Sequence, residues 1–310
     1  MDYYRVLSAI GLDQLVFAVH MRSILMLYRR MPMPVRSLLS LAIALAVVGC
    51  SGKEQTASDA ASAVPSDAPA SSAATASATA IADDAKGVSI QKTEEKDGGK
   101  WEFVYAWPAA VSAHPELAAL LKKDSEAALK EERAGFAETL ADSPPDCASC
   151  KSRSYGKEWK VVASVPGYLS ISADLSSYTG GAHGMYGRES SVWVESSKKL
   201  VKGVDMFTSA AALDKALQPA LCKALDAERA KKRGPDAPGS DYGFDDCQHV
   251  KDSTVFVGSS NGKAFDRIGI YFGPYVAGPY AEGAYELTLP VTKAVLATVK
   301  PEYKGAFAAK

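Results

Sequence analysis

Hydrophobic and polar residues alternate in several short segments of the C-terminal two thirds of the chain, a pattern that predicts β-strands. The first two, Val88–Glu94 and Trp101–Trp107, lie on either side of the turn Lys96–Gly99. Further strands are expected at 157–165, 168–177, 186–195, 254–257, 266–272 and 284–289. Asn261-Gly262 lies between two of these segments and indicates a hairpin.

Two longer segments have helical periodicity. In the first, Pro115 marks the start and Pro144-Pro145 the end. Its apolar face consists of Leu117, Leu120, Leu121, Ala128, Leu129, Phe136 and Leu140. The second, Ser209–Arg233, repeats leucine every four residues from Leu213 to Leu225, and Thr208 or Ser209 can cap it. Pro219 should kink or split it. Strands that alternate with only two main helices predict an α+β fold, with antiparallel sheets packed against those helices.

The N-terminal 49 residues have the layout of an export signal. Arg29, Arg30 and Arg36 precede an apolar run of 11 residues, 38–48, which is too short to span a bilayer. Val47-Val48-Gly49-Cys50 follows and resembles the lipobox of bacterial lipoproteins. That resemblance implies diacylglyceryl transfer to the Cys50 sulfur, cleavage before Cys50, and acylation of its new amine by a fatty acid such as palmitate. The alternative is an ordinary secretory signal with a chance cysteine.

The signal is longer than usual, so Met21, Met31 or Met33 is an alternative start. Residue 51 is Ser rather than Asp, which in a Gram-negative host implies the periplasmic face of the outer membrane. Residues 50–85 then form the lipidated cysteine and a linker. Within 56–85, 13 residues are Ala and 6 are Ser, which indicates a flexible coil of about 30 Å. We therefore expect a small N-terminal α+β domain at 86–150 and a C-terminal domain at 151–310.

Composition and charge narrow the classes of function. Hydrophobic residues make up 47% and charged residues 23% of the chain, which are values of a globular protein. The first 49 residues contain five arginines and two aspartates, so removing them leaves 30 basic and 34 acidic residues, a net charge of −4. Because there is no basic surplus to neutralise phosphates, nucleic acid is not an expected partner.

Four cysteines remain besides Cys50, which suits an exported protein with disulfides. Three pairings are possible, and we favour Cys147–Cys150 with Cys222–Cys247. Cys147 and Cys150 have the spacing of a redox motif, but they follow Pro144-Pro145-Asp146 in a loop instead of opening a helix, so a structural disulfide is the preferred interpretation.

Patterns typical of catalysis lack their required context. The segment 258–262 matches G-x-S-x-G, but a strand-like segment follows it and no histidine lies beyond His249. His114, His183 and His249 are too far apart in sequence to form a helical metal pair. We therefore expect no catalytic residues, no metal and no cofactor, and a protein that is not an enzyme.

Two segments combine aromatic residues, glycine and proline. Tyr178-Thr-Gly180-Gly181-Ala-His183-Gly184 is the first, and 271–283, which contains Tyr275, Tyr280 and Glu282, is the second. Together with Asp205-Met-Phe207 between them, they resemble the C-terminal domain shared by the ectodomain of the RsiV anti-sigma factor and the accessory region of the PdaC peptidoglycan deacetylase. The resemblance covers about 160–300, and residues 86–145 are similar to the smaller domain that precedes it in that family.

The resemblance implies a cell-envelope module, since the anti-sigma factor domain binds lysozyme and the deacetylase acts on the wall. Neither activity transfers, because the chain shows no cytoplasmic sigma-binding segment and no catalytic domain. We expect a lipid-anchored, non-catalytic module that binds a basic wall hydrolase or peptidoglycan. The candidate binding residues are Tyr178, Gly180, Gly181, His183, Tyr275, Tyr280 and Glu282. The alternatives are a wall hydrolase or deacetylase with His183 in its site, and a structural envelope lipoprotein.

Overall fold

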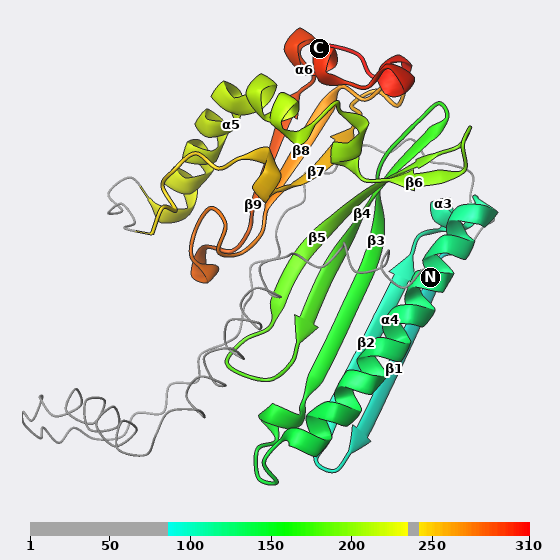
Figure 1. The fold of residues 1–310 in the computed structure, drawn as a ribbon, viewed down its shortest axis with the longest axis vertical. Helices are drawn as coiled ribbons and strands as arrows, with labels where there is room; N and C mark the ends of the chain where they lie inside the picture. The colour runs from blue at the N-terminus through cyan, green and yellow to red at the C-terminus, as the bar shows by residue number, and fades with distance from the viewer. Residues whose placement is uncertain (1–85, 235–241) are drawn as a thin grey trace, which may run out of the picture. The chain divides into compact units, whose positions relative to one another are not determined.

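The computed structural model describes residues 86–234 and 242–310 (Figure 1). The predicted signal, Cys50 and the linker lie outside the described residues. The strands are β1 (Val88–Lys96), β2 (Gly99–Trp107), β3 (Arg153–Val165), β4 (Tyr168–Tyr178), β5 (Met185–Val194), β6 (Lys199–Val201), β7 (Thr254–Gly258), β8 (Arg267–Phe272) and β9 (Tyr285–Pro290). The α-helices are α3 (Ala109–Ser112), α4 (Pro115–Asp142), α5 (Ala210–Arg233) and α6 (Lys293–Thr298).

Two sheets and two long helices confirm the α+β prediction. Strands β1 to β6 form one sheet in sequential order, and β7, β8 and β9 form a second, antiparallel sheet. One pair departs from the predicted antiparallel pattern, because β2 and β3 are parallel. The 28 residues of α4 span about 42 Å, so the chain returns along the helix and β3 begins beside the start of β2. The predicted boundary at 150/151 therefore lies between two hydrogen-bonded strands of one sheet.

The first hydrophobic core lies between α4 and the six-stranded sheet (Figure 1). Strand β2 contributes most to it, because its odd-numbered residues from Gly99 to Trp107 are buried. Trp101, Phe103 and Tyr105 are inaccessible to solvent, and Leu117 and Leu121 of α4 pack in the same cluster. The alternation of β2 thus covers one face with large apolar side chains, which is the main stabilising contribution of this layer.

The second core joins α5 to the three-stranded sheet and α6. Leu213, Leu217, Leu221 and Leu225 are all buried, as their spacing predicts, and Ser209 caps the helix by accepting a hydrogen bond from the Ala212 amide at 3.0 Å. The helix runs without interruption through Pro219, so the predicted split does not occur. Pro219 is exposed, and water can serve the backbone carbonyl that loses its donor there.

Candidate functional site

The loop between β4 and β5 contains the first aromatic and glycine-rich segment. Gly180 and Gly181 have φ of +91° and +97°, a conformation that glycine adopts without a steric penalty. The Tyr178 hydroxyl donates to the Gly181 carbonyl at 2.9 Å and closes the loop on itself. This arrangement brings His183 to the tip, where its side chain is exposed.

The loop between β8 and β9 contains the second segment. Tyr275 has φ of +66°, which is unusual for a bulky residue and carries a backbone cost of about 1–3 kcal/mol. Its ring is 50% exposed, so burial of the ring does not offset this cost. Strained, exposed aromatic residues of this kind are concentrated at binding and active sites, which makes Tyr275 a candidate site residue.

The two loops meet through their aromatic rings, although they lie more than ninety residues apart in the chain. The His183 imidazole stacks on the Tyr280 ring with centroids 3.9 Å apart and planes 22° from parallel. The Tyr280 hydroxyl donates to the Gly184 carbonyl at 2.8 Å, and the Tyr275 hydroxyl lies 3.3 Å from His183 Nε2. The structure thus brings three of the predicted binding residues, His183, Tyr275 and Tyr280, into direct contact.

The contacts of His183 define its neutral tautomer. Its Nδ1 lies 2.9 Å from the Gly184 carbonyl oxygen, which can only accept, so Nδ1 carries the proton. Nε2 is then the acceptor and receives the Tyr275 hydroxyl. Among the described residues, no carboxylate contacts either ring nitrogen, whereas a histidine that acts as a general base is commonly oriented by one.

Two further residues belong to this surface and were not predicted. Met185 and Tyr186 begin β5 beside the loop tip and are 45% and 39% exposed. The Tyr186 ring packs edge-on against Tyr280, with centroids 6.0 Å apart. We call the set His183, Met185, Tyr186, Tyr275 and Tyr280 the aromatic surface. Among the described residues, it holds three of the five exposed large hydrophobic side chains. The only sequence signal for Met185 and Tyr186 is their place directly after the glycine-rich segment 178–184.

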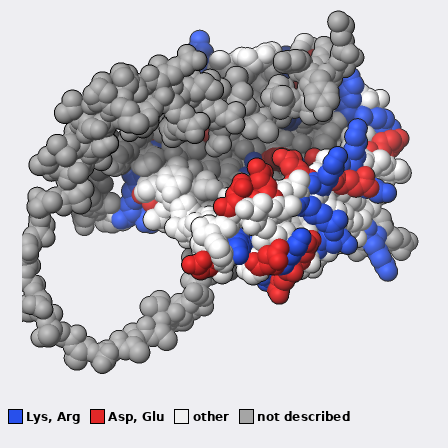
Figure 2. Space-filling view, turned by 60° about the horizontal axis from the view of Figure 1, so that its bottom comes forward, with Lys and Arg blue, Asp and Glu red and all other residues white. Residues whose placement is uncertain are grey.

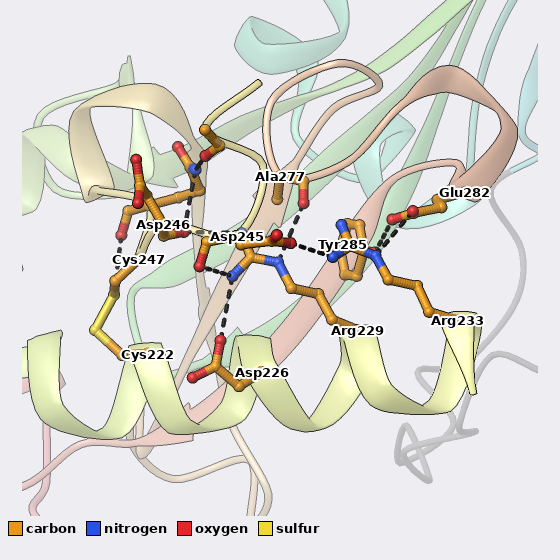
Figure 3. Close-up of polar contacts among 12 residues, drawn as sticks. Cys222, Asp226, Arg229, Arg233, Asp245, Asp246, Cys247, Ala277, Glu282 and Tyr285 are labelled. Atoms are coloured by element: carbon orange, nitrogen blue, oxygen red, sulfur yellow. Dashed lines mark hydrogen bonds and ion pairs between the residues drawn. A yellow bond between two sulfur atoms is a disulfide. The ribbon is translucent and has the colours of Figure 1, made fainter. Parts of the chain in front are cut away.

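Arg229 of α5 fixes the β8–β9 loop behind the aromatic surface (Figure 3). Its side chain is buried, and its Nε donates to the Ala277 carbonyl at 3.2 Å. The other guanidinium nitrogens donate to the carbonyls of Asp245 and Asp246 at 3.1 and 2.8 Å. One side chain therefore joins the helix, the segment after residue 241, and the aromatic loop.

Glu282 faces this scaffold and not the solvent. Arg233 Nε lies 2.8 Å from one of its carboxylate oxygens, and the Tyr285 hydroxyl donates to the other (Figure 3). Burial alone would raise the pKa of Glu282, but the hydrogen bonds from Arg233 and Tyr285 hold that pKa below its ordinary value. Burial and the bond to Glu282 raise the pKa of Tyr285 to about 12. Glu282 therefore stabilises the loop, and its role as a binding residue stays a prediction for a side chain that is 18% exposed.

Both favoured disulfides are present. Cys147–Cys150 closes a short turn after α4, and Cys222–Cys247 ties α5 to the segment whose carbonyls accept hydrogen bonds from Arg229. The G-x-S-x-G segment forms a turn between β7 and β8, in which the Ser260 amide and hydroxyl both bind Asp266. That turn leads into β8 and not into a helix, as the hairpin interpretation predicts.

No group of three or more His, Cys, Asp or Glu side chains within 86–234 and 242–310 is arranged to hold a metal ion. In the same part of the chain, no helix combines the length and apolar character needed to cross a membrane.

Comparison with known proteins points to the cell envelope. Residues 74–186 match the family model described as Deacetylase PdaC. The match covers the predicted N-terminal domain and the Tyr178–Gly184 loop, and it ends before the β8–β9 loop. No curated protein matches the chain.

Two solved structures of the DUF3298 family are similar to the chain. The one from Bacteroides fragilis shares 19% identity at a TM-score of 0.43, and covers 72% of this chain and 97% of its own. The one from Pseudomonas aeruginosa PAO1 shares 17% identity at a TM-score of 0.42, and covers 74% of this chain and 99% of its own. Likenesses at this level carry no argument about the site. The PdaC match by itself supports an extracytoplasmic module associated with the cell envelope.

Proposed function

We propose that this chain is a lipid-anchored, non-catalytic binding module of the cell envelope, and that its aromatic surface binds the glycan strands of peptidoglycan. The observation that carries the proposal is the exposure of Tyr275, Tyr186 and His183 around the half-buried ring of Tyr280. Exposed rings stack against the C–H faces of sugar rings. The phenolic hydroxyls at the ring edges are able to exchange hydrogen bonds with sugar hydroxyls.

The charges around the surface favour a glycan over a basic wall hydrolase. Glu282 is bound to Arg233, and Glu286 and Asp174 are both paired with Arg188 at 2.8 and 2.9 Å. Asp174 also pairs with Lys160 at 2.5 Å, so each of the three carboxylates has a cationic partner within the molecule and offers little attraction to a cationic protein. On the face shown in Figure 2, acidic and basic side chains of the described residues are interspersed, without a patch of one sign.

The same geometry supports a binding role over a catalytic one. The His183 nitrogens are occupied by the Gly184 carbonyl and the Tyr275 hydroxyl, and the ring stacks on Tyr280. A deacetylase or hydrolase at His183 would need a metal or a carboxylate partner for this imidazole. An assay for released acetate and for new reducing ends from peptidoglycan tests this alternative, and activity that His183→Ala removes would establish it.

The binding proposal is tested with purified peptidoglycan sacculi in a co-sedimentation assay and with N-acetylglucosamine oligomers in calorimetry. Tyr275→Ala should weaken binding about fivefold to tenfold, since an aromatic contact contributes about 1–1.5 kcal/mol. Tyr242→Ala is the matched control, because Tyr242 is 85% exposed and lies outside the aromatic surface. Binding to a basic lysozyme but to neither glycan would overturn the glycan assignment in favour of a hydrolase partner.

A further inference from the structure

The β4–β5 loop lies beside the turn that the Cys147–Cys150 disulfide closes. A Cβ placed on Gly180 would lie 3.5 Å from the Ser149 carbonyl oxygen and 3.6 Å from Cys150 Cα, so the loop runs beside this turn with room for about one methyl group between the two backbones. Within the turn, the Cys150 amide donates to Cys147 Sγ at 3.3 Å. The disulfide therefore shapes the surface on which the loop that carries His183 rests.

The disulfide-closed turn is itself fixed to the rest of the sheet layer. The Ser143 hydroxyl donates to the Cys150 carbonyl at 3.1 Å. Lys151, whose side chain is buried, donates to the carbonyls of Pro145 and Asp97 at 2.9 and 3.0 Å. The turn also borders solvent, because Cys150 and Thr179 both line an open cavity of about 350 Å³. A small thiol can therefore approach this disulfide.

The second disulfide supports the other loop through Arg229. Cys247 directly follows Asp245 and Asp246, whose carbonyls accept from the Arg229 guanidinium. The bond from Cys247 to Cys222 holds that segment against α5, seven residues before Arg229 on the same helix (Figure 3). Arg229 in turn donates to Ala277, two residues after Tyr275.

We propose that the two disulfides position the two halves of the aromatic surface, so that ligand binding requires the oxidised protein. This inference rests on the proposed glycan-binding function. Cys147–Cys150 positions His183 through Gly180, and Cys222–Cys247 positions Tyr275 through Arg229. The chain is accordingly competent to bind only where its disulfides form, which is the exported compartment and not a reducing cytoplasm.

The reduction step is a thiol–disulfide exchange with a dithiol. A dithiol thiolate attacks one cysteine sulfur and displaces the other as a thiolate, and the second dithiol sulfur then resolves the mixed disulfide. Two electrons pass from the dithiol, which becomes a cyclic disulfide. Its two protons convert the cysteine sulfurs to thiols.

Hydrogen exchange on the unliganded protein tests the positioning directly. In the Cys147→Ser, Cys150→Ser variant, amide exchange should rise at least tenfold within 178–184 and stay unchanged within 275–283. In the Cys222→Ser, Cys247→Ser variant, the rise should fall within 242–249 and 275–283. The opposite pattern, or unchanged exchange in both variants, would overturn the inference regardless of any ligand.

Binding to sacculi provides the second readout. Dithiothreitol should weaken binding of the wild type at least tenfold, and reoxidation should restore it, while alkylation and intact mass confirm each redox state. Thermal unfolding monitored by circular dichroism shows whether the reduced protein is still folded at the assay temperature. Equal binding by folded reduced and oxidised protein would refute the redox requirement. If oxidised protein does not bind at all, the proposed function fails, and the exchange experiment still decides the positioning.

Discussion

Replacing Arg229 by alanine should destabilise the fold and displace the aromatic loop, because the buried Ala277 carbonyl accepts from this side chain. It is 5% exposed and donates to the carbonyls of Ala277, Asp245 and Asp246, while Asp226 supplies an ion pair at 3.2 Å. Ala277 is fully buried, so its carbonyl would lose the donor that the structure provides there.

The magnitude follows from these contacts. A hydrogen bond to a charged group contributes about 1.5–3 kcal/mol, and a buried group left unpaired costs about 1–3 kcal/mol. The Asp246 carbonyl also accepts from Gln248 Nε2 at 3.2 Å, and water that enters the vacated space will serve part of the rest, so we expect a loss of about 3 kcal/mol, mostly from the buried Ala277 carbonyl. For a domain of this size, about 2–4 °C per kcal/mol corresponds to a fall of about 6–12 °C in melting temperature.

Denaturant unfolding followed by circular dichroism, with both disulfides intact, measures this loss. Asp226→Asn is the matched control: the Asp226 side chain is 66% exposed, and a surface ion pair of this kind contributes about 0.3–0.5 kcal/mol. Arg229→Lys should recover part of the stability, since an ammonium group can reach fewer of the three carbonyls. An Arg229→Ala variant within 0.5 kcal/mol of the wild type, or no more affected than Asp226→Asn, would refute the reasoning.

Three further outcomes follow from the structure and the sequence. The pKa of Glu282 is lowered in the folded state, so its bond to Arg233 stabilises the fold above the ordinary glutamate pKa, and this stabilisation is lost as pH falls through the folded pKa. The difference in unfolding free energy between wild type and Glu282→Gln should therefore be constant from pH 6 to 8 and shrink below a pH of about 4.5, which denaturation at a series of pH values measures. Removal of the helix cap in Ser209→Ala should cost about 1 kcal/mol in the same unfolding assay, and no change would show that the bond to the Ala212 amide contributes nothing. Cys50→Ser should abolish lipid attachment, and membrane fractionation that finds normal anchoring and mature mass would contradict the lipobox interpretation.

Local sequence pattern was sufficient for most of the secondary structure. The odd-numbered residues of β2 all point inward because one face of the strand packs against α4. This produces the period of two in the sequence. The leucines of α5 repeat because one helical face is buried. Each of these signals is local, since a strand or helix encodes its buried face in its own side chains.

The parallel pairing of β2 and β3 was not predictable in the same way. Alternation indicates which face of a strand is buried but not the direction of its neighbour, and that direction depends on the path through α4. Pro219 illustrates a related limit. Its effect on α5 depends on whether its position faces solvent or core, and the position is exposed.

The same distinction between local sequence pattern and tertiary structure applies to the candidate site. The unusual combination of aromatic residues with glycine and proline marked both loops, and the cysteine count with its spacing favoured the pairing that the structure contains. Two loops had to meet across the fold before His183 could stack on Tyr280. The same meeting of loops lets Met185 and Tyr186 extend the surface. Glu282 turned inward because Arg233, 49 residues earlier, reaches its carboxylate. The sequence by itself determined the elements and the residues of unusual chemistry, since those are written in local composition; the tertiary structure decided which of them face solvent together, because exposure and contact depend on partners distant in the chain.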